Sequence, residues 1–529
     1  MAFSFVIKNA TVIDGTGKEA RKTDVGIEGK EIKTIGTIRG SEGGELIEGK
    51  GLFLMPGMID LTNHADRNFS LFHAPQAENL VRQGITTIVT GACGISLAPL
   101  TKPEDINIVS HWVDTSALNT DWLSFAEFRA TLSRQKLGVN VATLVGHATI
   151  AHHKDSMHLL LEQALVEGAR GVSFSLHHAP GQSVSEDFFL DVAGEVYQRN
   201  GIISIHVRDE GAGLLSSVAE AIRIARMSGV RMHIAHLRAL GRTHWPDFTE
   251  ALAIIRRARD EGVAMSADVV PYGRTDALLV NFLPAWAREG GDNGLRKYLI
   301  DIAKRQEIER DLHTLTLHPD RILFAFLDKE KELVGKTLAQ AADLRGVSPE
   351  AALLEIIYAN DFRVRVFSKT ISQINVQEAF QEDFVVVSSN GEIVVSPEEQ
   401  SYYLEKELPH PRSFGALPRF FDRFVKKDES IPRDESTPGD ESIPRMLSWE
   451  KAVQKATSLP AAIIGLTDRG IIKTGARADL VLFDPETIKD NATYLHPYQY
   501  SDGINYVFVN GKPVVARGTF HPLAAGEVL

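Results

Sequence analysis

A regular alternation of apolar and amphipathic segments over residues 55–425 is the feature that most constrains the fold of this chain. Short apolar segments are separated by stretches of helical period, such as Glu186–Arg199 and Leu214–Ser228. Alternation of this kind predicts parallel strands joined by crossover helices. The expected strands include Thr86–Thr90, Val141–Val145, Gly171–Ser175, Ile202–His206, Arg231–His236 and Met265–Val270.

Polar side chains that could bind a ligand follow several of these strands. This placement is typical of a (β/α)8 barrel, which carries its functional site at the carboxyl ends of its strands. An open, doubly wound sheet is the alternative fold. Because the polar residues come from many successive strands, we expect an α/β chain built on a TIM-like (β/α)8 barrel over residues 55–425.

The two ends of the chain carry short strand patterns separated by glycines and charged turns. Residues 1–54 are too short to form a stable domain alone. Near the other end, Asn510-Gly511 lies between two apolar strand patterns, which is a strong signal for a hairpin. We therefore predict a small β-sandwich domain built from residues 1–54 and 446–529.

Two segments interrupt the alternation. Residues 280–365 contain a charged helical region, Asn293–Thr314, and are predicted to form an insertion over the barrel mouth. Residues 428–445 repeat a hexapeptide, DESIPR-DESTPG-DESIPR. Charged residues, Ser and Pro in this pattern leave no apolar face, so we predict a flexible loop at residues 426–445. A protein-binding tag is the alternative for the repeat.

Charge and cysteine content exclude several classes of protein. The 529 residues carry 57 Lys and Arg against 69 Asp and Glu, and the net charge of −12 disfavours a general nucleic-acid binder. No apolar stretch is long enough to span a bilayer, and Met1–Lys8 lacks the features of a signal peptide. The single cysteine excludes an intrachain disulfide, so we expect a cytoplasmic protein that binds neither nucleic acid nor membrane. The oligomeric state stays open.

Three residues at expected strand ends could bind a metal ion. Cys93 closely follows one strand, while His206 and His236 each end another. Side chains at neighbouring strand ends converge in a barrel. A thiolate and two imidazoles suit zinc and leave a fourth position for water or substrate. His233, three residues before His236, is expected to point to the opposite face of the strand.

The segment Met55–His64, in which Pro-Gly leads into an apolar strand ending on a histidine, resembles the opening of the amidohydrolase superfamily. Other motifs are similar to those of the N-acyl-D-amino-acid deacylases (D-aminoacylases), a branch of that superfamily. The resemblance covers nearly the whole chain and implies a TIM-like barrel, a small terminal β-sandwich and zinc at the strand ends. The motifs lie at Gly91–Pro99, Gly146–Thr149, Gly171–Leu176, His206–Gly211, Asp268–Tyr272, His410–Gly415 and Ala478–Val481.

The resemblance also implies a ligand set. The cysteine and two histidines that bind zinc tightly in the family correspond to Cys93, His206 and His236. A weaker second metal position uses a His-x-His pair and the Asp of a Ser-Asp-Gly motif, which Thr62 and Asn390 alter here. That Asp also carries the proton between water and leaving amine, and an amide cannot do so. We expect one zinc ion, with at most a weak second, and impaired deacylation.

Further residues are implied to bind the substrate. Arg238 and Tyr272 match the family residues that hold a substrate carboxylate, and His147 is assigned to the same pocket. The expected partner is a small molecule with a carboxylate. If hydrolysis survives, another group must carry the proton, and His64 is the first choice because it stands at a strand end. The other candidates are Asp66, His147, His177 and His178.

Three functions stay open on the sequence alone. The first, which we favour, is zinc-dependent hydrolysis of an N-acyl amino acid or a related amide. The second is a non-hydrolytic zinc enzyme, performing condensation or cyclisation in a specialised pathway, which fits Asn390 in place of an acid/base. The third is a non-catalytic descendant that binds a ligand or partner, and the presence of Cys93, His206 and His236 argues against it.

Overall fold

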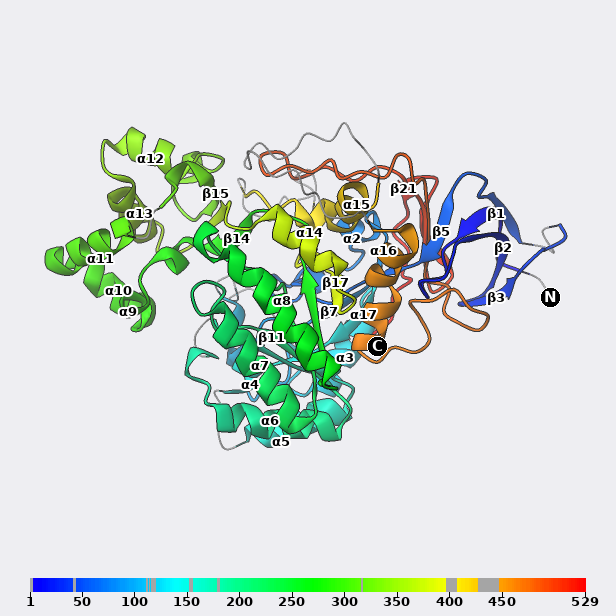
Figure 1. Cartoon of the computed structure of the whole chain (residues 1–529), viewed down its shortest axis with the longest axis horizontal. Coiled ribbons are helices and arrows are strands. Elements are labelled where there is room, and N and C mark those ends of the chain that lie inside the picture. The colour runs from blue at the N-terminus through cyan, green and yellow to red at the C-terminus, as the bar shows by residue number, and fades with distance from the viewer. Residues whose placement is uncertain are drawn as a thin grey trace.

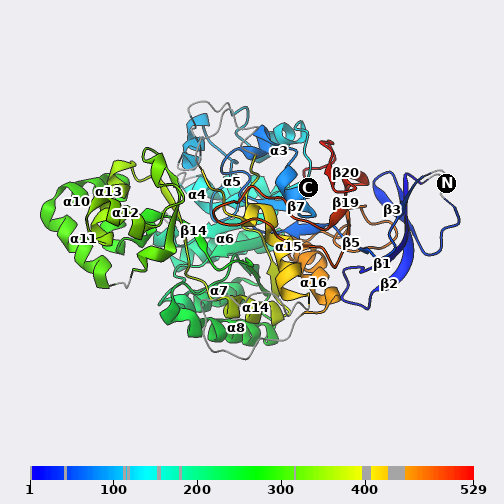
Figure 2. The same cartoon turned by 90° about the horizontal axis from the view of Figure 1, so that it is seen from above.

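The computed structural model describes residues 3–40, 44–110, 113, 115, 120–151, 156–177, 181–314, 317–395, 407–426 and 447–529. The hexapeptide repeat of the predicted loop, residues 428–445, and His178 lie outside these residues. Along the long axis, helices α9 (Ala285–Arg288) to α13 (Pro349–Ala359) protrude at one end and strands β1 (Phe5–Val12) to β3 (Glu31–Ile35) lie at the other (Figure 1). A larger α/β body lies between them, and the view from above shows the same order (Figure 2).

Parallel strands form the centre of the α/β body. They make one sheet in the order β6-β7-β8 and a second in the order β9-β10-β11-β12-β13-β17. Only Leu144 separates β8 from β9, and beyond β6 and β17 a parallel bridge joins Asn63 to Gly391. The strands are β6 (Met58–Asp60), β7 (Ile85–Thr90), β8 (Asn140–Thr143), β9 (Val145–Gly146), β10 (Gly171–Ser175), β11 (Ile202–His206), β12 (Arg231–Ile234), β13 (Met265–Val269) and β17 (Val385–Val387).

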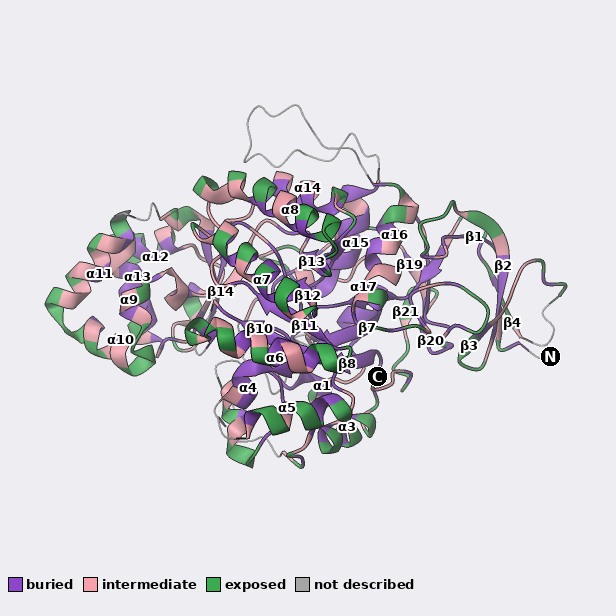
Figure 3. Ribbon diagram, turned by 60° about the horizontal axis from the view of Figure 1, so that its bottom comes forward, coloured by how far each residue is buried: buried purple, intermediate pink, exposed green. Residues whose placement is uncertain are grey.

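Amphipathic helices cover these strands and expose their polar faces (Figure 3). In α7 (Leu214–Ser228), for example, Leu214, Val218 and Ala221 are buried, and Gly229 ends the helix at a φ of 74°. None of the described helices combines the length and apolar character needed to cross a membrane. The other helices of this body are α1 (Ser70–His73), α2 (Glu78–Val81), α3 (Phe125–Ser133), α4 (His147–Ala151), α5 (Met157–Val166), α6 (Glu186–Gln198), α8 (Trp245–Asp260), α14 (Gln373–Gln381), α15 (Arg412–Phe424), α16 (Trp449–Ala456) and α17 (Ser458–Ile463).

Both ends of the chain contribute to one nine-stranded sheet, in the order β21-β20-β19-β18-β5-β1-β2-β3 with β4 against β1. Met55 of β5 pairs with Val481 of β18, so the sheet anchors the chain just before β6. Asn510 and Gly511 have φ of 47° and 76°, as a two-residue hairpin turn requires. The remaining strands are β2 (Arg21–Glu28), β4 (Glu45–Glu48), β5 (Phe53–Pro56), β18 (Leu480–Phe483), β19 (Ile504–Val509), β20 (Lys512–Ala516) and β21 (Thr519–Phe520).

A third unit interrupts the α/β body between β13 and β17. Its antiparallel sheet has the order β14-β16-β15, and it has its own cluster of buried apolar side chains. The helical region expected at Asn293–Thr314 is divided at Asp301, whose backbone is extended. The elements are β14 (Thr275–Leu278), α10 (Gly291–Ile300), α11 (Ile302–Thr314), β15 (Ile322–Leu327), α12 (Leu338–Arg345) and β16 (Val364–Ser368), together with α9 and α13.

Candidate metal centre

Cys93, His206 and His236 converge at the carboxyl ends of three parallel strands. One ligand atom of each lies within 4.8 Å of those of the other two, and all three residues are buried. Cys93 Sγ lies 3.3 Å from His236 Nε2. A tetrahedral zinc ion with bonds of about 2.0–2.3 Å needs ligand atoms about 3.3–3.7 Å apart. The donor set and its spacing therefore fit zinc with three protein ligands.

Cys93 and His236 hold opposite charges, and zinc would have to displace the proton of His236 in order to bind there. Burial raises the pKa of the Cys93 thiol, but the charge of His236 and hydrogen bonds from His206 and His236 hold that pKa well below its usual value. Burial lowers the pKa of His236, but the Cys93 thiolate outweighs burial and raises it to about 9. A thiolate is thus stabilised where a cation would bind.

The strand before His236 ends earlier than expected. β12 stops at Ile234, and His236 has a φ of 40°, so the alternation of faces does not extend to it. The rule of alternating faces, by which His236 was preferred over His233, therefore does not apply here, but the close group with Cys93 and His206 contains His236 and not His233. His233 Nε2 lies 2.8 Å from a carboxylate oxygen of Asp268, and the backbone N–H of His236 donates to the other oxygen at 2.8 Å.

Glu210 connects both histidines to Arg238. Its carboxylate lies 3.2 Å from His206 Nε2 and 3.5 Å from His236 Nδ1, and it accepts a hydrogen bond from Arg238 at 2.9 Å. Burial raises the pKa of Glu210, but the charges of Arg238 and His206 hold it well below its usual value. Glu210 also forms a second close group with His177 and His206, within 4.8 Å, so His206 belongs to two possible metal-binding sets.

His64 and Asn390 meet beside this centre. His64 Nε2 lies 2.7 Å from Asn390 Oδ1, and the backbone N–H of His64 donates to the carbonyl of Gly391. Burial lowers the pKa of His64 to about 4, so its imidazole is neutral near pH 7. Asp66 lies apart from this pair, where its carboxylate accepts the Gly91 N–H at 2.7 Å and supports the loop that carries Cys93.

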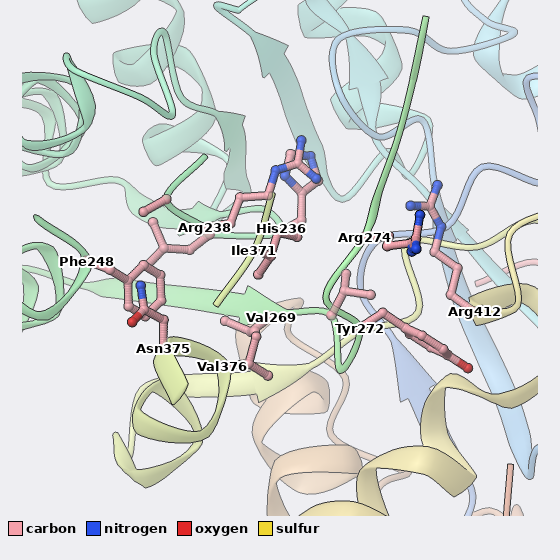
Figure 4. Close-up of a pocket in the computed structure, with 13 residues that line it drawn as sticks. His236, Arg238, Phe248, Val269, Tyr272, Arg274, Ile371, Asn375, Val376 and Arg412 are labelled. Carbon is pink, nitrogen blue, oxygen red and sulfur yellow. The ribbon is translucent and has the colours of Figure 1, made fainter. Parts of the chain in front are cut away.

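A pocket adjoins the candidate ligands, and apolar side chains and three arginines line it (Figure 4). His236 and Arg238 lie on one side, and Arg274 and Arg412 on the other. Arg412 lies 3.3 Å from the Asp276 carboxylate, whereas no carboxylate of the described residues lies within ion-pair distance of Arg274. This combination of apolar wall and positive charge suits a small organic anion.

Tyr272 and His147 differ from the other expected site residues. The ring of Tyr272 lines the pocket, but its hydroxyl donates to Asp490 at 2.7 Å and points away from Arg238 (Figure 4). His147 is buried and stacks on Phe174, with ring centroids 4.7 Å apart. Burial lowers the pKa of His147 to about 4. The structure does not include His147 among the residues that line the pocket.

Comparison with known proteins identifies the family. A model described as amidohydrolase family matches residues 432–515. N-acyl-D-aspartate deacylase of Alcaligenes xylosoxydans xylosoxydans is 30% identical over an alignment of 530 positions, which covers 96% of this chain and 91% of that protein. The chain belongs to the N-acyl-D-amino-acid deacylases. The N-acyl-D-glutamate deacylase of the same organism is also 30% identical, over 96% of this chain and 93% of its own.

Solved structures of the family share the mixed α/β fold. N-acyl-D-glutamate deacylase from Bordetella bronchiseptica, in complex with zinc and a phosphonate inhibitor, is 26% identical, with a TM-score of 0.80 and full coverage of both chains. A D-aminoacylase, described as having a binuclear centre with one-metal activation and second-metal attenuation, is 27% identical with a TM-score of 0.79, covering 100% of this chain and 99% of its own. The resemblance predicted from sequence motifs is confirmed.

Three residues at the site were missed by the sequence analysis. Glu210 stands four residues after His206 within a family motif, which was the available signal. Asp268 opens the Asp-x-x-Pro-Tyr motif, but its contact with His233 could not be predicted from the sequence. Arg274 follows Tyr272 by two residues and carries no motif of its own.

Proposed function

We propose that this chain is an amidohydrolase that removes the acyl group from an N-acyl amino acid at a single zinc ion held by Cys93, His206 and His236. The observation that carries the proposal is the convergence of these ligands, within 4.8 Å of one another, beside a pocket lined by arginines. Zn²⁺ bound there supplies a Lewis acid for the amide carbonyl. Thr62 and Asn390 replace the residues of a second metal position, which favours one ion.

The two parallel sheets support a fold proposal as well. The bridge from Asn63 to Gly391 and the short break at Leu144 are the joints at which the sheets would close into one (β/α)8 barrel. We take residues 275–368, with their own apolar cluster, as the insertion expected at 280–365. We likewise propose that the sheet formed by both ends of the chain is the expected small β domain.

Arg238 binds the carboxylate of the substrate in this proposal. Its guanidinium lines the pocket next to His236, and Glu210 fixes its orientation through the hydrogen bond of 2.9 Å. Guanidinium groups bind carboxylates through paired hydrogen bonds. Arg274 and Arg412 add positive charge on the other side of the pocket, so we expect a preference for an acidic side chain, as in the substrates named for the two deacylases.

His64 carries the proton in place of the family aspartate. With Asn390 Oδ1 as the acceptor, His64 Nε2 bears the hydrogen and Nδ1 is the basic atom. The neutral imidazole accepts a proton from the attacking water, whose oxygen bonds to the acyl carbon. As the C–N bond breaks, the same proton passes to the amine nitrogen. His64 is thus both base and acid.

A non-hydrolytic reaction at the same centre is the second candidate. The specific observation in its favour is that the partner of His64 is the amide of Asn390, which neither accepts nor releases a proton. Condensation or cyclisation of an amino acid derivative does not require activation of water. The pocket and the ligand set would serve both reactions.

Release of free amine distinguishes the two candidates. The zinc-loaded protein is incubated with N-acetyl-D- and N-acetyl-L-amino acids that have acidic or apolar side chains, with Cys93→Ala as the blank. We expect release above the blank, and most from the acidic substrates. If zinc is bound stoichiometrically and no substrate of the panel releases amine, the hydrolytic proposal is wrong and the second candidate is favoured.

A further inference from the structure

Asp268, a buried carboxylate of β13, gathers hydrogen bonds from three parts of the α/β body. One oxygen accepts from the Thr62 hydroxyl at 2.6 Å and lies 2.8 Å from His233 Nε2. The other oxygen accepts from the backbone N–H of His236 at 2.8 Å. Thr62 follows β6 and His233 lies in β12, so this carboxylate links the first parallel strand to the loop that carries a metal ligand.

Because the cluster is buried, the Asp268 carboxylate depends on the hydrogen-bond donors around it. Asp268 and Thr62 are fully buried, and His233 is 1% exposed. A buried carboxylate is costly unless each oxygen accepts hydrogen bonds. Removal of one donor leaves Asp268 with fewer partners and frees its side chain to turn. The hydroxyl of Thr62 is therefore tied to the orientation of the carboxylate.

His236 depends on that orientation. Its φ of 40° is uncommon for a residue other than glycine, and the hydrogen bond from its N–H to Asp268 holds the backbone there. The same backbone geometry brings His236 Nε2 to 3.3 Å from Cys93 Sγ. A shift of Asp268 would move the imidazole relative to the thiolate.

We propose that Thr62 and His233 act through Asp268 to fix His236 in its ligand position, which makes Thr62 a positioning residue of the zinc centre. The inference rests on the proposed zinc site. Thr62 stands where the family has a histidine of the second metal position. In this chain it would instead support the ligands of the first metal position. Groups that orient metal ligands typically change metal affinity about 10–100-fold when removed.

Zinc affinity of substituted proteins tests the inference. Thr62→Val removes the hydroxyl and keeps the branched shape, Thr62→Ser keeps the hydroxyl, and His233→Leu removes the second donor. The matched control is Thr86→Val, because Thr86 is equally buried in β7 and its hydroxyl donates one hydrogen bond, at 3.4 Å to the Met58 carbonyl. The zinc dissociation constant is measured by competition with a chelator, and Co²⁺ absorption reports the geometry of the ligands.

We expect Thr62→Val and His233→Leu to weaken zinc binding about 10-fold or more and to alter the Co²⁺ spectrum, while Thr62→Ser and Thr86→Val resemble the wild type. Wild-type affinity and spectrum in both Thr62→Val and His233→Leu would overturn the inference. If Thr62→Val does not fold, the comparison of His233→Leu with Thr86→Val decides in the same way. A wild-type protein that binds no stoichiometric zinc would instead overturn the proposed function.

Discussion

His64 and Asn390 are hydrogen bonded to each other, with Nε2 and Oδ1 2.7 Å apart, at the ends of the first and last parallel strands. The pair occupies the position at which we propose that the proton is transferred. The amide accepts the imidazole hydrogen and so fixes the tautomer, but only the imidazole can exchange protons. A carboxylate at the same place would both orient His64 and stabilise its protonated form.

Asn390→Asp is therefore expected to increase the rate of amide hydrolysis. A general acid/base group typically contributes about 10²–10⁴-fold, so we expect kcat to rise at least about 10-fold. The measurement is kcat for release of amine, with zinc content determined on the same samples. In a His64→Gln background the gain should shrink if the new carboxylate acts through the imidazole. An unchanged kcat for zinc-loaded Asn390→Asp would contradict the role assigned to this position.

Cys93→Ala is expected to abolish tight zinc binding. The substitution removes the only anionic ligand of the three, and the two imidazoles that are left bind zinc more weakly. Elemental analysis after dialysis should find zinc in the wild type and little in the variant. Zinc should also raise the melting temperature of the wild type and leave that of Cys93→Ala unchanged, because a ligand stabilises only a protein that binds it. Equal zinc contents would refute the ligand assignment.

Features of the fold that depend on residues close together in the sequence could be predicted, and others could not. Strands and helices were predictable because apolar residues recur with a local period, and the candidate ligands Cys93, His206 and His236 were visible because each stands near the end of such a strand. The periodicity could not show that the strand ends at Ile234 and that His236 has a positive φ, which changes the direction of its side chain. The rule of alternating faces could therefore not decide between His233 and His236.

Contacts between side chains that are far apart in the sequence could not be predicted from local periodicity either. Tyr272 was expected to help to hold a substrate carboxylate, whereas in the structure its hydroxyl donates to Asp490, 218 residues later. Arg274 and Arg412 approach the same pocket from separate segments, and neither is marked by periodicity. The family resemblance supplied candidates for the site, but the hydrogen bonds between those candidates required coordinates.

Arg238→Gln is expected to weaken substrate binding. The substitution removes the charge that would pair with the substrate carboxylate, and charge-assisted hydrogen bonds contribute about 1.5–3 kcal/mol each. We expect KM for an N-acyl amino acid to rise about 10–100-fold, with a smaller change in kcat. The control substrate is an N-acyl amine without a carboxylate, for which wild type and variant should have similar kcat/KM. An equal loss with both substrates would indicate that Arg238 acts through Glu210 and the metal ligands instead.

Asp490 gives the chain a pH-dependent contribution to stability. Burial raises the pKa of Asp490 to about 6 from an ordinary value of 3.8, although the hydrogen bond from Tyr272 acts in the opposite direction. The folded state then binds more protons at this site than the unfolded state between these two values. The contribution is complete below pH 3.8 and is lost as the pH rises through about 6, so the free energy of unfolding falls by about 2–3 kcal/mol across this window.

Asp490→Asn should remove that dependence. The amide stays neutral at every pH, and its oxygen can still accept the Tyr272 hydroxyl, which donates to Asp490 at 2.7 Å in the native chain. Relative to the wild type, the variant should therefore become more stable as the pH rises from about 4 to about 7, by about 2–3 kcal/mol. Chemical denaturation of both proteins at a series of pH values measures the difference. A constant difference would mean that this carboxylate titrates normally in the folded protein, and that its hydrogen bond to Tyr272 forms with the ionised group.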